Sequence, residues 1–345
     1  MSASTDAPGV PGAQCVDHVA FTVPNLDAAV EFGREALGAD LIYRLPPLAH
    51  KDDWMERKLD VHPRAVTEIA LMRLGPTMNV ELFEYHSPGR SVTPRTPGST
   101  GSLHLGLHVD DIELALAALG KYEGVRAFGP VRDGAEWVRV SNPWGIPLDL
   151  RARPTLPPYH EHDAAEGPLP GFRQVDSVGY SVADLAQAED FFALVLGAEP
   201  LGRTTLDLAE PGLAEALGVP ADGTLERALL RLGPLDTLEL CHFSGPGHAH
   251  TDSPRNDDVG GRHLALHVTD VDAAAAYMAN VAGCTVLGEP ETIPDGPIAG
   301  DRWVYVRTPL GLHIELVRMP DGDLPYERET TARRRPAGSL RWTDR

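Results

Sequence analysis

The sequence predicts an α+β fold built from four β-α-β-β-β modules. The stretch at 102–110, Ser-Leu-His-Leu-Gly-Leu-His-Val-Asp, returns at 261–270 as Gly-Arg-His-Leu-Ala-Leu-His-Val-Thr-Asp, with both histidines in register. In each copy the histidines alternate with leucine or valine, which places them on opposite faces of a strand. Strand-like and helix-like patterns also follow one another in a repeated order. Two halves of the chain are therefore copies of one unit.

The first module begins near Val16, where residues 16–23 alternate as a strand does. Residues 25–38 follow with an Asn cap, helical spacing of the apolar residues and a Gly stop. Three further strands are expected at 41–44, 67–74 and 79–85. A tight Gly-Pro turn joins the last two. The order of elements is therefore β-α-β-β-β.

The same order returns three times along the chain. The second module is expected to contain a strand at 103–109, a helix at 112–119, and strands near 126–128, 137–140 and 147–151. The third repeats the first with a strand at 175–182, a helix at 184–196 and a strand at 238–243, and the last runs over 263–317. The spacing agrees, because His18 precedes His104 by 104 − 18 = 86 residues and Ser177 precedes His263 by 263 − 177 = 86.

These modules divide the chain into two domains with tails and a linker. The expected boundaries are a flexible tail at 1–15, a first domain at 16–153, a linker at 154–172, a second domain at 173–319 and a C-terminal tail along a surface at 320–345. Only the first module of each half carries a long insertion, and each insertion contains a short helical stretch. These insertions lie at 46–65 and 205–224. Such segments can cover a pocket.

The composition of the chain excludes several classes of partner. The chain has 50 acidic and 30 basic residues, so its net charge of −20 repels phosphate backbones and anionic lipid. Three scattered cysteines are too few for a disulfide framework, and no apolar run is long enough to span a membrane. We therefore expect a cytoplasmic protein with a small-molecule substrate, no nucleic-acid or membrane partner, and a homodimer as an open alternative.

Equivalent strand positions in each half carry residues that can bind a metal. These are His18, Glu81, His104 and Asp149 in the first half, and Ser177, Glu239, His263 and Glu315 in the second. A lone strand histidine is more often a hydrogen-bonded core residue, and a lone acid is often salt-bridged, as Asp149 could be with Arg151. The equivalent placement of so many ligand types favours a metal site. His108 and His267 lie four residues further along their strands, about 13 Å away, too far to share one ion with their neighbours.

With these positions the sequence resembles the vicinal oxygen chelate superfamily, which includes glyoxalase I, methylmalonyl-CoA epimerase, extradiol dioxygenases and bleomycin- or fosfomycin-resistance proteins. The resemblance extends over 16–317. It implies that paired modules curl into two cup-shaped half-barrel sites, with a metal held by the first and fourth strands of the paired modules. The fold does not define the reaction, because the same cup serves lyases, epimerases, oxygenases and binding proteins.

The resemblance leaves two ligand sets open. Pairing adjacent modules gives His18, Glu81, His104 and Asp149, whereas pairing the first module with the last, as in fused glyoxalases, gives His18, Glu81, His263 and Glu315. We prefer the second set, since it has two histidines and two glutamates with no shortened side chain. The other cup then collects His104, Asp149, Ser177 and Glu239. Ser177, a poor ligand, argues against the arrangement of common extradiol dioxygenases.

Such a ligand set suits Fe(II), Mn(II), Co(II), Ni(II) or Zn(II) with positions left for substrate. We expect a metal-dependent isomerase, epimerase or lyase acting on a small substrate with vicinal oxygens, with Glu81 and Glu315 as the catalytic carboxylates. One alternative is an Fe(II) ring-cleaving dioxygenase of catechols or hydroquinones, which needs only His18, His263 and Glu315. A second alternative is a metal-free binding or resistance protein.

Overall fold

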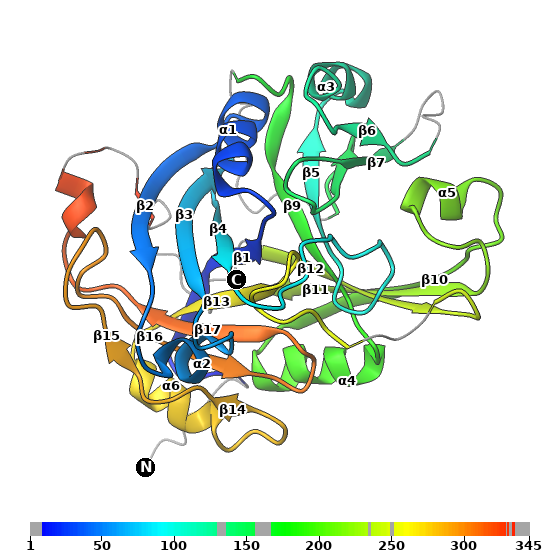
Figure 1. Ribbon diagram of the computed structural model, residues 1–345. Helices are drawn as coiled ribbons and strands as arrows, with labels where there is room; N and C mark the ends of the chain where they lie inside the picture. The colour runs from blue at the N-terminus through cyan, green and yellow to red at the C-terminus, as the bar shows by residue number, and fades with distance from the viewer. Residues whose placement is uncertain are drawn as a thin grey trace, which may run out of the picture.

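The computed structural model describes residues 9–129, 136–155, 167–233, 236–248, 252–328, 330 and 333–334. Two mixed sheets form most of it (Figure 1). The first has the order β14-β16-β17-β13-β1-β4-β3-β2, with β15 paired to β16. Its strands are β1 (Ala13–Thr22), β2 (Asp40–Leu48), β3 (Val66–Leu74), β4 (Met78–His86), β13 (Arg262–Val268), β14 (Thr285–Val286), β15 (Glu291–Thr292), β16 (Arg302–Arg307) and β17 (His313–Arg318).

The second sheet has the order β10-β11-β12-β9-β5-β8-β7-β6. Its strands are β5 (Leu103–Val109), β6 (Arg126–Ala127), β7 (Trp137–Ser141), β8 (Leu148–Arg151), β9 (Phe172–Ser181), β10 (Glu199–Asp207), β11 (Thr224–Leu232) and β12 (Asp236–Ser244). Each sheet therefore combines modules from both halves of the chain. Modules one and four share the first sheet through the antiparallel pair β1 and β13, and modules two and three share the second through β5 and β9. In Figure 1 the blue strands accordingly lie among yellow and orange ones.

The helices begin and end where local sequence dictates. They are α1 (Leu26–Leu37), α2 (Trp54–Leu59), α3 (Ile112–Leu119), α4 (Leu185–Asp190) continued by a π-helical turn (Phe191–Val195), α5 (Leu213–Leu217), α6 (Val271–Met278) and a 3₁₀ turn (Pro325–Arg328). Asn25 caps α1 by accepting the backbone N–H of Ala28, and Gly38 ends it in the left-handed conformation with φ 72°. Asp111, Asp184 and Asp270 cap α3, α4 and α6 in the same way. The predicted helices at 25–38 and 112–119 are confirmed.

One apolar core joins the two sheets. It contains the leucine and valine rows of the repeated stretch, such as Leu105 and Leu264, together with buried residues of α1, α3 and α6. The opposite faces of the same strands carry His104 and His263, which are turned away from this core. The α+β fold of four modules is therefore confirmed, and it leaves one hollow polar face on each sheet. None of the helices in the described part of the chain has both the length and the apolarity needed to cross a bilayer.

The ends of the fold differ from the expected boundaries. Strand β1 begins at Ala13 and Val10 is buried in the shared core, so part of the expected tail at 1–15 is ordered. Apolar contact made by Val10 explains this order. In the expected surface tail at 320–345, Leu324 and Arg334 are buried, and Arg334 reaches a site described below. Residues 1–8 and most of the linker at 154–172 lie outside the described residues.

Asp236 gives a testable pH dependence of stability. It occupies the position on β12 that Met78 holds on β4, and burial raises the pKa of its carboxyl to about 7. Because an unfolded Asp has a pKa of about 3.9, the folded protein holds this proton longer, and stability falls as pH rises from about 4 to about 7. Asp236→Asn is expected to raise the free energy of unfolding at pH 8 by about 1–3 kcal/mol. Chemical denaturation at pH 5 and 8 checks it, since an equal effect at both values contradicts this assignment.

Candidate metal centre

Four buried side chains converge on the polar face of the first sheet. His18 lies on β1 and His263 on the antiparallel neighbour β13, while Glu81 on β4 and Glu315 on β17 lie on parallel strands outside this pair. Each offers one ligand atom, and these atoms all lie within 4.8 Å of one another. The structure thus brings together the set expected from pairing the first module with the last. It places His104 and Asp149, from the alternative set, in the other sheet.

The cluster is compact and charged. The two Nε2 atoms of His18 and His263 are 3.0 Å apart. His18 Nε2 lies 3.2 Å from a carboxylate oxygen of Glu81 and 3.1 Å from one of Glu315, and the corresponding distances from His263 are 3.5 and 3.4 Å. Burial raises the pKa of both carboxyls, but the adjacent histidines outweigh it and lower the pKa of each below its usual value. Both glutamates are therefore ionised at neutral pH.

A second layer of side chains orients His18. Its Nδ1 lies 2.7 Å from Asp17, which in turn accepts a hydrogen bond of 2.8 Å from Arg334. Arg334 also donates to Asp301 at 2.5 Å. A carboxylate on Nδ1 favours the tautomer whose Nε2 lone pair faces the cluster, an arrangement common around metal-bound histidines. Burial lowers the pKa of His18, but Glu81 and Asp17 raise it well above its usual value overall.

Tyrosines hold two other members of the cluster. Tyr43 donates a hydrogen bond of 3.4 Å to Glu81, and the Tyr305 hydroxyl lies 3.2 Å from Nδ1 of His263. Sequence reasoning missed both tyrosines, together with Arg334. The signal for Tyr305 was its place in β16, directly opposite Glu315 in the pairing register. Period-two alternation along that strand would have turned it toward the cluster.

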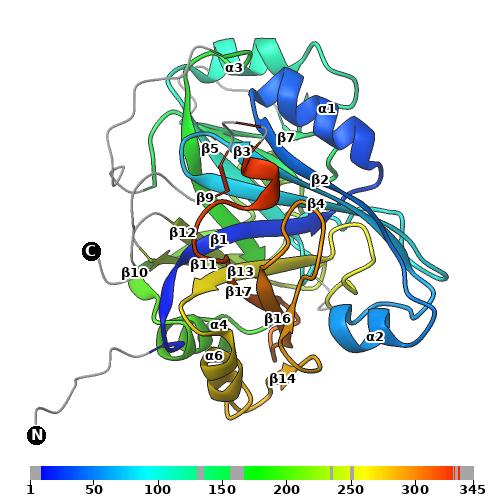
Figure 2. The same ribbon diagram turned by 90° about the vertical axis from the view of Figure 1, so that its left-hand side faces the viewer.

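His18, Glu81 and Glu315 of the cluster line a cavity of about 390 Å³. The apolar part of its lining includes Trp54 and Leu59 from helix α2, as well as Ile293 and Ile298. The first insertion therefore covers this pocket, as its position in the sequence indicated. Helix α2 lies against β16 (Figure 2). The insertion is fixed to the fourth module by a 3.0 Å contact between Asp60 and His313.

The donor set fits a divalent metal. Two imidazole nitrogens and two ionised carboxylates within one ion's reach form a mixed nitrogen and oxygen site of the kind that binds Fe(II), Mn(II), Co(II), Ni(II) or Zn(II). One such ion would satisfy all four buried groups at once. Four protein donors also leave room for substrate oxygens when the metal takes six ligands.

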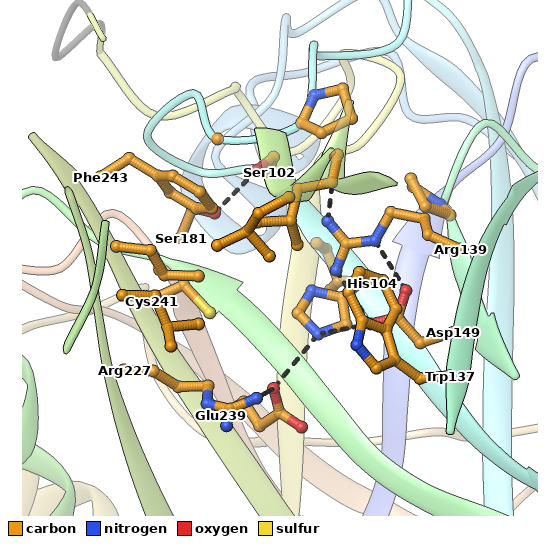
Figure 3. A pocket seen from close by; sticks show the side chains of 18 of the residues that line it. Ser102, His104, Trp137, Arg139, Asp149, Ser181, Arg227, Glu239, Cys241 and Phe243 are labelled. Atoms are coloured by element: carbon orange, nitrogen blue, oxygen red, sulfur yellow. Dashed lines mark hydrogen bonds and ion pairs between the residues drawn. The ribbon is translucent and has the colours of Figure 1, made fainter. Parts of the chain in front are cut away.

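The second cup has residues at the positions equivalent to the metal cluster, but its carboxylates are paired with arginines (Figure 3). His104, Asp149 and Glu239 line a cavity of about 310 Å³, and Ser177 donates a hydrogen bond of 3.0 Å to Glu239. Arg139 grips Asp149 with two hydrogen bonds of 2.6 and 2.9 Å, and Arg151 lies 2.5 Å from Glu239. Guanidinium groups thus neutralise the carboxylates. This cup does not fit a metal.

A glycine also sets the second cup apart. Gly179 lies directly opposite His104 on β9, and a methyl group there would overlap the imidazole ring. In the first sheet Ala20 occupies the equivalent position opposite His263. Because Gly179 has no side chain, the His104 ring can lie directly against the backbone. The methyl group of Ala20 prevents the same position for His263. His108 and His267 are half-buried and are not among the residues that line either cavity.

Both halves of the chain match a known superfamily. Residues 17–141 and 174–316 each match a model of the Glyoxalase/Bleomycin resistance protein/Dioxygenase superfamily, and the chain belongs to it. A relative from an Actinomyces species, named 2-epi-5-epi-valiolone epimerase, is 48% identical over 177 residues, which are 51% of this chain and 94% of the relative. An enzyme of the isomerase class is thus among the relatives of this chain.

Two solved structures share the arrangement of all four modules. Glyoxalase I from Zea mays is 18% identical, with a TM-score of 0.56 over 89% of this chain and 92% of that one. A putative dioxygenase from Bacillus subtilis is 14% identical, with a TM-score of 0.55 over 90% of this chain and 87% of that one. At these identities the likeness concerns the fold alone.

Proposed function

We propose that this protein is a metal-dependent epimerase of a small polyoxygenated ketone, 2-epi-5-epi-valiolone or a close analogue. The observation that carries the proposal is the buried cluster of His18, Glu81, His263 and Glu315, three of which, His18, Glu81 and Glu315, line a cavity. The reaction class comes from the Actinomyces relative, which is named as an epimerase. Metal dependence comes from the donor set.

A divalent metal held by these four residues would supply Lewis acidity toward neighbouring oxygens of the substrate. The chain's own contribution is to move the proton. Glu81 and Glu315 lie on β4 and β17, the strands on either side of the β1 and β13 pair, so each carboxylate enters the cup from its own side. Inversion of a centre needs a proton removed from one face and returned to the other. One ionised carboxylate can act as the base on its face. The other must first take a proton from solvent before it can act as the acid on the opposite face, and the base then releases the substrate's proton to solvent.

The remaining wall supports binding of a compact ring. The cavity volume of about 390 Å³ lies in the range of small-molecule sites. Tyr43 orients Glu81 through its hydrogen bond, and the buried Asp17 and Arg334 hold His18 in place. Trp54 and Leu59 add apolar surface to the cavity lining, which leaves less room for water beside a carbanion-like intermediate.

Hydrogen exchange tests this function. The metal-loaded protein, incubated in D₂O with 2-epi-5-epi-valiolone, is expected to invert one centre and replace its carbon-bound hydrogen by deuterium, seen by proton NMR, without consuming O₂. Glu81→Gln and Glu315→Gln are each expected to lower the rate by about 10²–10⁴-fold. Metal content is measured for each variant, because both residues are also candidate ligands.

Glu68→Gln is the matched control, since Glu68 lies on the neighbouring strand β3 and pairs with Arg44 at the surface. It should retain full activity. Uptake of O₂ with ring cleavage, in place of hydrogen exchange, would exclude the epimerase and favour the dioxygenase alternative. Unchanged turnover after complete removal of metal would exclude a role for the ion.

A further inference from the structure

Three arginines distinguish the second cup from the first. The strand pairings make Arg227, Arg139 and Arg151 the counterparts of Ile69, Tyr305 and Val317, since each pair has the same place relative to its neighbouring strand. Uncharged side chains around the first cup are thus replaced by guanidinium groups around the second. In a chain with a net charge of −20, such a concentration of positive charge in one cavity calls for an explanation.

Two of these arginines are fully engaged. Arg139 is committed to Asp149 by its two short hydrogen bonds, and its remaining reach extends to the carbonyl oxygen of Leu217 at 3.4 Å. Arg151 is held by Glu239 and also lies 3.3 Å from Asp176. Both therefore serve to neutralise acids of the cup. They explain its lack of fit for a metal.

Arg227 is different. Its closest acidic neighbour is Glu239, at 3.8 Å, and its Nε is buried without a hydrogen-bond partner among the described residues. Nε2 of His104 is also buried and makes no hydrogen bond within that part of the chain, although carboxylate oxygens of Glu239 and Asp149 lie 3.6 and 3.7 Å away. The Arg227 side chain is 32% exposed, so a ligand entering from solvent can reach its guanidinium and accept a hydrogen bond from the buried Nε.

Much of the remaining lining is apolar. It includes Leu213 and Leu217 of α5, Leu206 near the end of β10, Leu225 of β11, and the aromatic residues Phe243 and Trp137. Figure 3 shows Phe243 well apart from Trp137, and Trp137 close to His104 in this view. The cavity of about 310 Å³ therefore combines arginine side chains with an apolar lining.

We propose that the second cup is a metal-free binding site for a small organic acid, whose carboxylate pairs with Arg227 beside His104 and whose apolar body packs against the leucines of the second insertion. The charges of the lining favour an anionic ligand, because the cavity is lined by four arginines, including Arg153 at the rim, and only three carboxylates. The planar fork of arginine matches a carboxylate. The cavity is large enough for an aromatic ring or a short alkyl chain.

Isothermal titration of the metal-loaded protein with benzoate and hexanoate tests this proposal. Saturable binding of at least one acid at one site per chain is expected, and benzamide, the neutral counterpart of benzoate, should bind at least about tenfold more weakly. Arg227→Gln should weaken binding of the acid at least about tenfold. Arg231→Gln, on the same strand but outside the cavity lining, should leave it unchanged.

A carboxylate could also bind to a metal in the first cup, so His263→Ala serves as a second control. Retained binding of the acid in this variant supports the second cup, whereas its loss assigns the acid to the first cup and overturns the proposal. Equal affinity for benzoate and benzamide would show that the cavity selects shape without charge, and it would overturn the proposal as well. The same holds if neither acid binds.

Discussion

His263→Ala is expected to remove the bound metal and to abolish activity, whereas His104→Ala, the same change at the repeated position, should leave both nearly intact. His263 provides one of four donors that lie within 4.8 Å of one another, but His104 lies in a cup where arginines already occupy the carboxylates. Loss of a direct ligand should lower metal affinity by more than about 100-fold, since even supporting residues contribute up to that factor.

Metal analysis after dialysis, with circular dichroism to verify folding, measures this difference. His18→Ala should behave like His263→Ala, and Asp149→Ala should behave like His104→Ala in metal content. The unmodified protein should bind one equivalent of metal per chain. Normal metal content in His263→Ala, or loss of metal in His104→Ala, would disprove the assignment of the first cup as the metal site.

Arg334→Met is expected to destabilise the protein by about 3–5 kcal/mol at neutral pH, because it removes one partner from a buried charge network. Arg334 is paired to Asp17 and to Asp301, and all three side chains are 2% exposed. Without the guanidinium, two carboxylates remain in the interior with no cation between them. Arg333→Met is the matched control, since that side chain is 42% exposed and should contribute little.

The pH dependence of this loss is diagnostic. Burial raises the pKa of Asp17, but Arg334 and His18 outweigh it and lower that pKa below its usual value, so Asp17 contributes stability above pH 4 that is lost on acidification. In Arg334→Met both acids can take up protons, and the deficit should shrink as pH falls from 8 toward 5. Denaturant midpoints across this range measure it. A deficit independent of pH would show that Arg334 acts by packing alone.

The local alternation of polar and apolar residues predicted most of the fold, because strands and helices each impose their own period on the sequence. Period-two alternation placed His18, Glu81, His263 and Glu315 on polar strand faces, and the 86-residue spacing identified the modules. It could not choose between the two ligand sets, because both satisfy the same alternation. The choice depends on β1 pairing with β13, a contact between residues more than two hundred positions apart that no local signal encodes.

Other features were hidden for related reasons. Arg334 stands in a run of three arginines, and nothing in that run distinguishes the one that is buried. Arg139, Arg151 and Arg227 lie on strands, where arginine ordinarily reaches solvent, so their convergence on one cavity depends on how separate strands curl together. A side chain whose role depends on a partner far away in the sequence can be recognised only when the partner's position in the fold is known.

The composition of the two sheets also fixes when the metal centre can exist during synthesis. All eight strands of the second sheet come from one continuous stretch, 103–244, which leaves the ribosome as a block. The first sheet requires strands on either side of that block, and its ligand set is incomplete until Glu315 has been made. A nascent chain can thus hold every strand of the arginine-lined cup while it still offers a metal ion only His18 and Glu81.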